Sequence, residues 1–357
     1  MTTVAALAEA PSEPTSVFLR ACRHLAVDRT PVWLLRQAGR YQPEYRAIRE
    51  RHSLLEVIRT PELAAQVTLL PVDAFGVDAA IVFADILPPL VGMGLELEFV
   101  KGDGPRIGNP IASTRDVDLL GTPPAVETMA GTLDAVRIVR DELDSRDVPV
   151  IGFAGAPFTL ASYAIEGGTS RDFTKTKAFM LSEPAAWTRL LGKLVTVQAD
   201  YLLAQAAAGA QALQVFDSWA GRALGREDYL RYVAPHNREL FAKVAAAGVP
   251  VINFSLGVGA YLADAAACGG DVVGLDWSLP LDDAWALVGF ERPVQGNLDP
   301  ASLLAPWREL GHRIDDVLDR ASGRPGHVFN VGHGLTPKTP VDNVRRLVEH
   351  VRERTSA

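Results

Sequence analysis

The amino-acid sequence predicts an α/β fold, a single-domain (β/α)8 TIM barrel. Short apolar runs rich in Val, Ile and Phe recur along the whole chain. They alternate with longer segments of helical spacing, which is the pattern of repeated strand and helix units around a parallel sheet. No shift in composition divides the 357 residues into two parts. An open, doubly wound sheet is the alternative fold.

Eight apolar runs are the candidate strands. They comprise residues 32–35, 79–83, 148–153, 212–216, 249–254, 272–275, 293–296 and 327–331. The helix-like segments between them include residues 184–208, 226–246, 281–288, 300–321 and 340–352. Several of these begin with Asp, Ser or Pro, which suit the first turn of a helix. Two irregular segments, residues 88–124 and 167–176, are expected to lie as insertions over one end of the barrel.

The N-terminal segment, residues 1–15, is expected to be a flexible leader, and the barrel domain to span residues 16–357. The leader lacks a basic start and carries Glu9 and Glu13 where a secretory signal would be apolar. The longest apolar stretch, residues 79–95, is a poor membrane span because Asp85 and two prolines interrupt it. We therefore expect a cytoplasmic protein without a membrane partner.

The charge balance argues against one class of partner. A count of 35 Lys and Arg against 43 Asp and Glu gives a net charge of −8, which argues against a duplex nucleic-acid binder. A small acidic ligand is compatible with this charge if arginines are concentrated in one cleft. The only two cysteines, Cys22 and Cys268, can build neither a disulfide framework nor a multi-cysteine metal site.

Several catalytic motifs are absent from the sequence. It contains no phosphate-binding loop, no His-Glu-x-x-His, no Gly-x-Ser-x-Gly and no Cys-x-x-Cys. The lone Gly-x-Gly at residues 257–259 is interpreted as a turn. The seven histidines are scattered, so no metal site is predicted. These absences favour acid–base or electrostatic chemistry by side chains alone.

Polar side chains follow many of the apolar runs, where the active sites of (β/α)8 barrels form. Solvent-exposed loops would also place polar residues there. The number of such polar residues nevertheless indicates one convergent polar face of the barrel. The residues are Arg36, Gln37, Asp85, Thr159, Asp217, Ser218, Asn253, Ser255, Asp276, Asn297 and His333.

The first of these strand ends is rich in arginine. Arg36 and Arg40 flank Gln37, Ala38 and Gly39, and the small residues allow the main chain to approach a ligand closely. Two planar guanidinium groups in so short a loop suit bidentate binding of carboxylates. The same stretch has a plainer interpretation, a surface run of arginines paired with acids. Arg46 and Arg49 extend the positive patch. In the plainer interpretation, the acids that pair with the arginines are Glu44 and Glu50.

Asp85 closes the second apolar run and precedes Ile86. Burial raises the pKa of a carboxyl group unless arginines or N–H donors hold its charge. A carboxylate among arginines can accept hydrogen bonds from ligand N–H groups and stabilise a developing cation. The alternative role is a helix cap or a structural ion pair.

Tyr163 is expected one helical turn after the tight turn at residues 152–157, where Thr159 can cap the helix. Its hydroxyl could donate into the cleft, or its ring could be one more core aromatic. The segment that follows begins with residues 167–170 and has the composition of a mobile basic lid. Its cationic residues are Arg171, Lys175 and Lys177.

Two further strand ends supply candidate ligand contacts. Asp217 and Ser218 follow the fourth run, and His333 lies between Gly332 and Gly334 after the eighth. A histidine between two glycines is open to whatever occupies the cleft and can exchange a proton near neutral pH. The glycines could instead simply end the strand.

In these segments the chain resembles the uroporphyrinogen decarboxylase family. Residues 31–46, PVWLLRQAGRYQPEYR, are similar to the N-terminal signature of the family, and residues 152–163, GFAGAPFTLASY, to its second signature. VFADIL, FDSWAG and FNVGHG agree in order and spacing. The resemblance runs from Arg20 to Arg352. Leu35 stands where methionine is more usual, which is a volume-conserving exchange.

The resemblance implies a function and a set of site residues. The enzyme would remove the carboxyl groups of the four acetate side chains of uroporphyrinogen III, giving coproporphyrinogen III in haem and tetrapyrrole biosynthesis. It would work as a homodimer, without cofactor or metal. Asp85 would hold the pyrrole N–H groups, and Arg36, Tyr163, His333 or a water would deliver protons. The implied substrate-binding residues are Arg36, Gln37, Ala38, Gly39, Arg40, Arg49, Asp85, Tyr163, Ser218 and His333.

Two alternative functions differ from this one in chemistry. A zinc-dependent methyltransferase of the same superfamily needs thiolate and imidazole ligands after a middle strand, where this chain has Asn253, Phe254 and Ser255. A tetrapyrrole-binding carrier would bind the ligand tightly and release no carbon dioxide.

Overall fold

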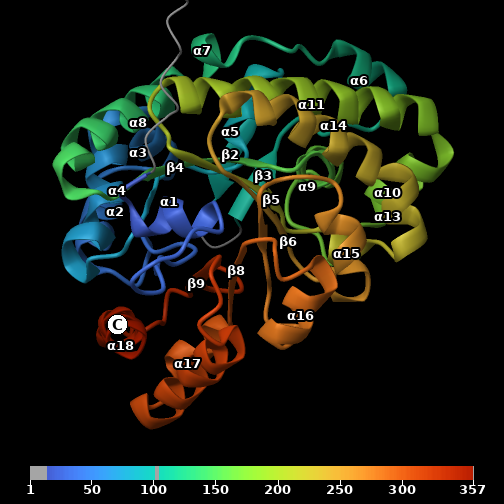
Figure 1. Cartoon of the computed structure of the whole chain (residues 1–357). Helices are drawn as coiled ribbons and strands as arrows, with labels where there is room; N and C mark the ends of the chain where they lie inside the picture. The colour runs from blue at the N-terminus through green and yellow to red at the C-terminus, as the bar shows by residue number, and fades with distance from the viewer. Residues whose placement is uncertain (1–13, 101–103, 357) are drawn as a thin grey trace, which may run out of the picture.

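The computed structural model describes residues 14–100 and 104–356, so all but the last two residues of the expected leader lie outside the described residues. Seven parallel strands form one curved sheet, surrounded by helices (Figure 1). In sheet order they are β1 (Ala80–Ile81), β4 (Val150–Gly155), β5 (Ala212–Asp217), β6 (Val251–Ser255), β7 (Val272–Gly274), β8 (Val294–Leu298) and β9 (His327–Val331). A separate antiparallel pair consists of β2 (Leu97–Val100) and β3 (Gly104–Ile107).

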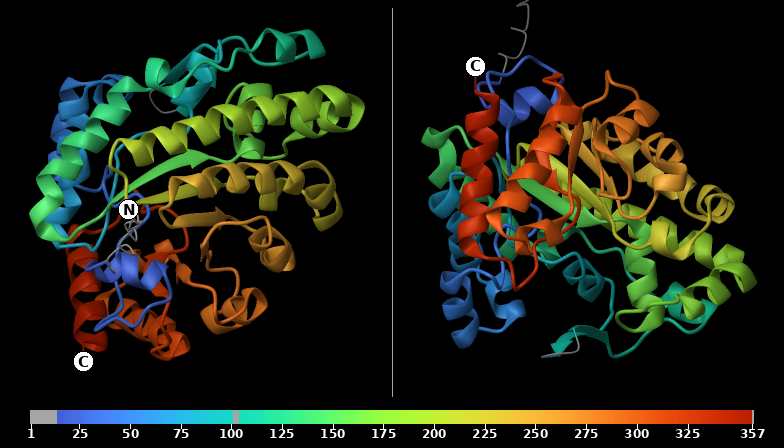
Figure 2. Two further views of the ribbon diagram at one scale, coloured as in Figure 1. Left: turned by 45° about the horizontal axis from the view of Figure 1, so that its top comes forward. Right: turned by 90° about the horizontal axis from the view of Figure 1, so that it is seen from below.

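The helices cover the outside of the sheet (Figure 2). In the first half of the chain they are α1 (Val17–Cys22), α2 (Pro43–Arg51), α3 (Leu54–Arg59), α4 (Pro61–Phe75), α5 (Pro88–Gly92), α6 (Thr114–Leu119), α7 (Ala125–Thr128), α8 (Ala130–Leu143), α9 (Pro157–Glu166) and α10 (Thr174–Ser182). In the second half they are α11 (Pro184–Ala207), α12 (Ala220–Ala223), α13 (Arg226–Tyr232), α14 (Ala234–Val244), α15 (Leu262–Ala266), α16 (Leu281–Val288), α17 (Trp307–Ala321) and α18 (Val341–Thr355). The long helix α11 packs against α14, and α18 packs against α4, so the ring of helices returns to its start.

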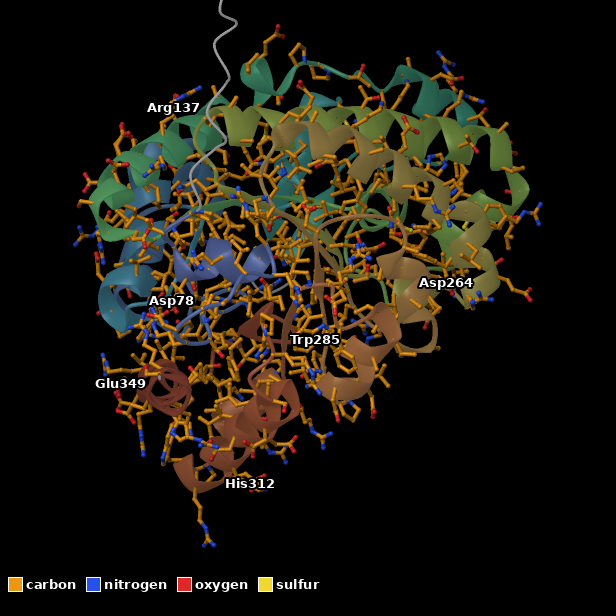
Figure 3. The ribbon with its side chains drawn as sticks, in the orientation of Figure 1. Asp78, Arg137, Asp264, Trp285, His312 and Glu349 are labelled. Carbon is orange, nitrogen blue, oxygen red and sulfur yellow. The ribbon has the colours of Figure 1, made fainter. Side chains whose placement is uncertain are left out.

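The first apolar run closes the barrel without forming a regular strand. Val32 makes a single parallel bridge to Phe329 of β9. On its other side, the N–H of Asp78 donates to the Val32 carbonyl at 2.8 Å, just before β1. The Asp78 carboxylate is buried, accepts the Val32 N–H at 2.8 Å, and pairs with Arg29 and Arg352 (Figure 3). The predicted barrel is confirmed, and the alternative of an open sheet is wrong because these contacts join its two edges.

The interior of the barrel includes a buried polar layer. Trp33 Nε1 donates to Gln295 Oε1 at 2.9 Å, and Gln295 Nε2 donates to Gln214 Oε1 at 3.3 Å. All three side chains are buried. These bonds tie the first run to β5 and β8 across the barrel, so the interior is packed and is not an open pore.

Two of the predicted helices are interrupted in the structure. The segment 226–246 divides into α13 and α14 at Val233, because Pro235 disfavours helical geometry just before it. The segment 300–321 divides into a 3₁₀ turn, Pro300–Leu304, and α17, with Pro306 as the N-cap of α17. The predicted span 281–288 coincides with α16.

The two predicted insertions pack against each other. The segment 88–124 contains α5, β2, β3 and α6. The Ile107 N–H donates to the Gly167 carbonyl at 2.9 Å, and Arg106 forms a bridge with Gly168. Within residues 14–100 and 104–356, no helix is long and apolar enough to cross a membrane.

Candidate active site

The carboxyl ends of the barrel strands carry the predicted site residues. Arg36 follows the first run, Asp85 follows β1, Tyr163 lies in α9 after β4, and His333 follows β9. Because the strands are parallel, all four positions lie at the same end of the barrel. The charge of Arg36 acts on the pKa values of Asp85, Tyr163 and His333. The structure therefore brings these four side chains together.

Arg36 has an unusual backbone conformation. Its φ of +59° lies in the left-handed region, which residues other than glycine rarely adopt and which recurs at functional sites. Its side-chain stem lies against Gly334, where a Cβ would be 2.6 Å from Arg36 Cγ. The guanidinium is exposed and forms no hydrogen bond or ion pair with the described residues. It is therefore available to an anionic ligand.

Gln37 supports this loop from within. Its side chain is buried, with Oε1 accepting the Leu34 N–H at 3.1 Å and Nε2 donating to the Ala79 carbonyl at 3.0 Å. Gln37 therefore holds the arginine loop against β1, and the structure does not bring its side chain to the cleft. Ala38 and Gly39 are half-buried at the surface of the loop.

The remaining arginines of the loop divide into two groups. Arg40 is exposed, and its side chain has no partner in the described part of the chain. Arg46 instead donates to the carbonyls of Arg40 at 3.1 Å and Tyr41 at 2.9 Å, so it stabilises the loop. Arg49 is half-buried and donates to the His52 carbonyl. The alternative pairing with nearby glutamates is not found among the described residues.

Asp85 combines a local turn with an open acceptor. Its Oδ1 accepts the Leu87 N–H at 2.9 Å, which forms an Asx turn; the alternative role of helix cap is wrong, because Leu87 is the N-cap of α5 and has no side-chain cap. Burial raises the pKa of Asp85, and the Leu87 N–H and the charge of Arg36 oppose that rise. No side chain of the described residues forms a salt bridge with it. The carboxylate keeps lone pairs for N–H groups of a ligand.

Tyr163 is held by a neighbouring aromatic ring. It stacks on Trp219 with ring centroids 3.8 Å apart, and Phe173 meets the same indole at 5.1 Å. Burial and the charge of Asp85 raise the pKa of Tyr163, so its hydroxyl stays protonated. Phe173 is buried, which anchors the predicted basic lid to the rim of the site.

Ser218 is positioned by a buried hydrogen-bond network. Its N–H donates to Thr159 Oγ1 at 3.0 Å, and Thr159 Oγ1 donates to Asp217 Oδ1 at 2.9 Å. Asp217 also accepts the Ala220 N–H at 3.1 Å. The Ser218 side chain is half-buried, and its hydroxyl makes no hydrogen bond with the described residues.

His333 is half-buried at the end of β9. Burial, together with the charges of Arg36 and Arg222, lowers its pKa to about 4. The imidazole is therefore neutral at pH 7 and can donate one hydrogen bond and accept another. A Cβ at Gly332 would be 2.7 Å from the backbone nitrogen of Trp277, so the segment after β9 packs tightly against the segment after β7.

An aromatic row lies at the ends of the middle strands. Phe153, Phe216 and Phe254 meet edge to face, with centroid distances of 5.5 Å and 5.8 Å. Phe216 is half-buried, whereas Phe153 and Phe254 belong to the core. The site therefore has an apolar floor beside its charged groups.

Three other polar strand ends bind main-chain groups. Asn253 donates to two carbonyls of the segment after β6, and Asn297 donates to the carbonyls of Asp276 at 2.9 Å and Leu279 at 2.8 Å. Asp276 accepts the Gly257 N–H at 2.5 Å and the Ser278 N–H at 2.8 Å. Asn297 and Asp276 hold the rim together, whereas Asn253 lies within β6 and binds the segment just before β7, away from the carboxyl ends of the strands. The predicted turn at residues 257–259 is confirmed, with φ of +77° at Gly257.

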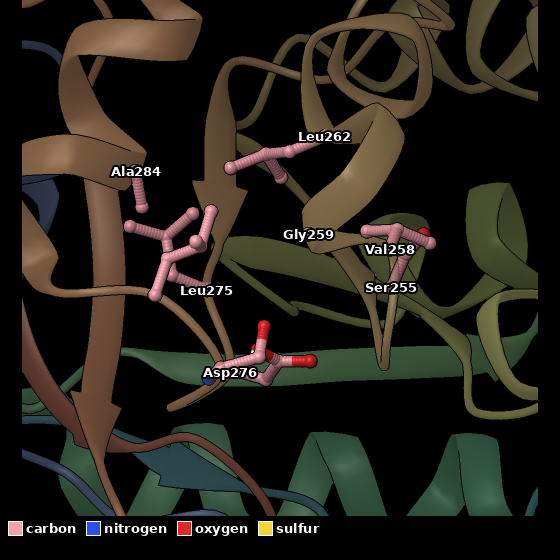
Figure 4. A pocket seen from close by; sticks show the side chains of 9 residues that line it. Ser255, Val258, Gly259, Leu262, Leu275, Asp276 and Ala284 are labelled. Atoms are coloured by element: carbon pink, nitrogen blue, oxygen red, sulfur yellow. Dashed lines mark hydrogen bonds between the residues drawn. The ribbon is translucent and has the colours of Figure 1, made fainter.

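A small cavity lies beside Asp276 and Ser255 (Figure 4). Its volume of about 10 Å³ is close to the least that a single water molecule needs. The Ser255 hydroxyl is buried there without a partner. The cavity is thus too small for an organic ligand.

Two residues of the site are not among the candidates predicted from the sequence. Trp219 stacks on Tyr163, and Arg222 acts on His333. Trp219 belongs to the FDSWAG segment, and Arg222 is the residue directly after it. The presence of an arginine shortly after a polar strand end is the signal that could have indicated Arg222.

The described residues bring no three His, Cys, Asp or Glu side chains together in a way that could hold a metal ion. What the site assembles is one carboxylate, three hydrogen-bond donors of different kinds and an apolar floor. Such a set can bind carboxylates at its rim and can stabilise a cation that forms beside Asp85.

Comparison with known proteins shows the family of the chain. The family model described as uroporphyrinogen decarboxylase (URO-D) matches residues 13–354. The chain belongs to the uroporphyrinogen decarboxylase family. Curated proteins of that name from Roseiflexus sp. (strain RS-1) and Chloroflexus aurantiacus (strain ATCC 29366 / DSM 635 / J-10-fl) are 56% and 55% identical to it. These matches cover 95% and 94% of this chain and 98% and 94% of the relatives. The resemblance inferred from the motifs is confirmed.

A solved structure supports the fold. A methyltransferase from Methanosarcina mazei matches with a TM-score of 0.80 over 96% of this chain and 99% of that chain. Its sequence identity of 20% shows the shared fold alone.

Proposed function

We propose that this protein decarboxylates the four acetate side chains of uroporphyrinogen III, giving coproporphyrinogen III, with Asp85 at the centre of the site. Membership of the family supports the reaction. The observation that carries the assignment to these residues is the half-buried carboxylate of Asp85, on whose pKa the charge of Arg36 acts and beside which Tyr163 lies.

The free guanidinium groups explain how an acidic protein could bind a polycarboxylate. Arg36 and Arg40 have no partner among the described residues, so they can form bidentate contacts with substrate carboxylates. The half-buried ring of Phe216 offers apolar contact to a pyrrole. We place Ala38, Gly39, Arg49 and Ser218 at the edge of the same binding surface, and Gln37 behind it.

Asp85 would accept hydrogen bonds from the pyrrole N–H groups. Protonation of a pyrrole ring carbon produces an iminium cation, and a carboxylate held beside the ring stabilises that charge. The Leu87 N–H and Arg36 favour the ionised form of Asp85 against the effect of burial. Burial still outweighs them, so the pKa of Asp85 lies above its ordinary value, and hydrogen bonds from the pyrrole N–H groups would add to the groups that favour the carboxylate.

Each decarboxylation then follows from the iminium. The bond between the acetate methylene and its carboxylate breaks, its electron pair moves into the ring, and carbon dioxide leaves. A second proton converts the exocyclic methylene to a methyl group, and the ring carbon returns the first proton. The net step consumes one proton for each carbon dioxide released.

Three side chains are candidates for moving these protons. Tyr163 stays protonated because its pKa is raised, and His333 is neutral at pH 7 because its pKa is lowered to about 4. Arg36 completes the set. A water held by any of the three is the remaining candidate.

We also propose that the protein is a cytoplasmic homodimer without a cofactor or metal requirement. Family membership supports this assembly. Sedimentation equilibrium of the full chain tests it, and a monomer at micromolar concentration would contradict it.

The decisive experiment is anaerobic incubation of the full chain with uroporphyrinogen III. We expect carbon dioxide release and, after oxidation of the products, chromatographic conversion of uroporphyrin through partly decarboxylated species to coproporphyrin. Tight binding without carbon dioxide would identify a carrier. Stoichiometric zinc together with methyl transfer would identify a methyltransferase.

A further inference from the structure

The short helix α12 brings an additional positive side chain to the rim of the site. Arg222 is exposed, and its guanidinium makes no hydrogen bond or ion pair with the described residues. The nearby Arg226 is different, because it pairs with Asp264 through hydrogen bonds of 2.6 Å and 3.0 Å. Arg222 is thus left without a neutralising partner.

The backbone that carries Arg222 is tightly packed. A Cβ at Gly221 would be 2.6 Å from the carbonyl carbon of Gly257 and would overlap the Leu256 carbonyl oxygen. The Leu256 N–H donates to the Asp217 carbonyl at 2.9 Å. Helix α12 therefore rests directly on the turn after β6, and the position of Arg222 does not depend on a loose loop.

The stem of Arg222 runs along this turn. A Cβ at Gly257 would be 3.5 Å from Arg222 Cγ, which is ordinary van der Waals contact. An acid that binds this turn, Asp276, accepts main-chain N–H groups from Gly257 and Ser278, one on each oxygen. No salt bridge joins Asp276 to Arg222 in the described part of the chain.

Arg222 follows β5, so it lies at the same end of the barrel as His333. Its charge, like that of Arg36, acts on the pKa of His333, and Arg222 is carried on the β5 side of the rim. Ser218, with its free hydroxyl, lies four residues before Arg222 on the same segment. An anion bound between these groups would meet two positive charges.

We propose that Arg222 binds a carboxylate side chain of the tetrapyrrole on the β5–β6 side of the cleft and thereby positions the macrocycle over Asp85. This inference rests on the proposed function. It adds a carboxylate-binding residue that the motifs of the arginine loop do not contain.

The test is steady-state decarboxylation of uroporphyrinogen III by Arg222→Ala, Arg222→Lys and the wild type. A charge-assisted hydrogen bond is worth about 1.5–3 kcal/mol, so we expect KM to rise about 10- to 100-fold in Arg222→Ala, with little change in kcat. Arg222→Lys should recover part of the loss. The KM of Arg222→Ala should also depend less on ionic strength.

Arg238→Ala is the matched control, because it removes the same charge from an exposed position on α14. An equal KM for Arg222→Ala, Arg238→Ala and the wild type would overturn the inference, provided that the wild type releases carbon dioxide. A wild type without activity would contradict the proposed function instead. Circular dichroism and urea denaturation of the variants exclude misfolding as the cause of a raised KM.

Binding of the product coproporphyrinogen III, measured anaerobically, distinguishes the carboxylates. The product keeps its propionates and has lost its acetate carboxyl groups. Weaker product binding by Arg222→Ala indicates that Arg222 holds a propionate. Unchanged product binding together with a raised KM for uroporphyrinogen III indicates an acetate.

Discussion

The side-chain stem of Arg36 lies directly across Gly334, with no room for a side chain at that position. A Cβ at Gly334 would be 2.6 Å from Arg36 Cγ and 2.9 Å from Arg36 Nε. The loop after the first run and the loop after β9 are thus packed into one surface. The direction of the Arg36 guanidinium depends on the absence of a side chain next to His333.

Gly334→Ala should therefore impair catalysis without removing a functional group. The added methyl group must displace Arg36, and a misplacement of about 1 Å can cost about 100-fold in rate. We expect kcat/KM for uroporphyrinogen III to fall by about that factor. The control is Gly192→Ala in α11, where a Cβ meets nothing within 4 Å. Equal activity of the two variants would contradict the packing role.

Asp85→Asn should nearly abolish turnover while the fold survives. The amide keeps the size of the carboxylate but removes the charge that would stabilise the iminium cation. Loss of one such electrostatic group typically costs about 100- to 1000-fold in kcat. Carbon dioxide release measures this loss, and urea denaturation measures stability. Activity at the wild-type level would refute the central role of Asp85.

Tyr163→Phe separates the hydroxyl from the ring. Phenylalanine can keep the stack on Trp219, where the ring centroids lie 3.8 Å apart. If the hydroxyl takes part in proton transfer, kcat falls by about 100-fold with unchanged thermal stability. Trp219→Leu removes the stack instead, and we expect it to lower both activity and Tm. A Tyr163→Phe variant with full kcat would exclude the hydroxyl from the chemistry.

His327 makes stability fall in acid. Burial lowers its pKa to about 4, from an ordinary value of 6.5. As the pH falls through 6.5, the unfolded chain takes up a proton on His327 before the folded chain does. The contribution of His327 to the free energy of unfolding is therefore constant above pH 6.5 and is lost between pH 6.5 and 4. The full loss is about 3 kcal/mol.

His327→Gln should remove this loss. The amide nitrogen can still donate to the Gly296 carbonyl, which His327 Nε2 contacts at 2.9 Å. We expect the wild type to lose about 3 kcal/mol more unfolding free energy than the variant between pH 7 and pH 4. Urea denaturation at both values measures this difference. The control is His312→Gln, at an exposed position on α17 (Figure 3). Parallel pH profiles for the wild type and His327→Gln would count against burial as the cause.

Asp78→Ala should destabilise the barrel strongly. The buried carboxylate binds Arg29 at 2.6 Å, Arg352 at 2.9 Å and the Val32 N–H at 2.8 Å. Removing one partner of a buried ion pair costs about 3–5 kcal/mol because the other charges remain without a partner. Chemical denaturation measures this cost. Asp73→Ala, in the exposed pair with Arg146, should cost less than about 1 kcal/mol.

Much of the site could be predicted from local sequence. Arg36, Asp85 and His333 each follow an apolar run, and parallel strands bring such positions to one end of a barrel. Gln37 shows where this reasoning stops, because its side chain binds the Ala79 carbonyl and not the cleft. That contact joins segments 42 residues apart. Spacing within the loop carries no information about it.

The first apolar run shows the same limit. Its composition indicates a strand, yet Val32 makes only one bridge to β9 and closes the barrel through Asp78. The positions of Trp219 and Arg222 also depend on contacts between distant segments. Tyr163 stacks on the ring of Trp219, and Gly257 lies beside the side-chain stem of Arg222.

The sequence by itself determined the class of barrel, the family and the four candidate residues of the proposed site, because strand periodicity and contiguous motifs are local properties. The tertiary structure decided which of the remaining polar groups are free. Gln37, Arg46 and Asp276 are occupied by main-chain groups, whereas Arg36, Arg40 and Arg222 have no partner among the described residues. A hydrogen bond or an ion pair depends on which segments meet in space. Whether an arginine can bind a substrate is therefore settled only when the chain has folded.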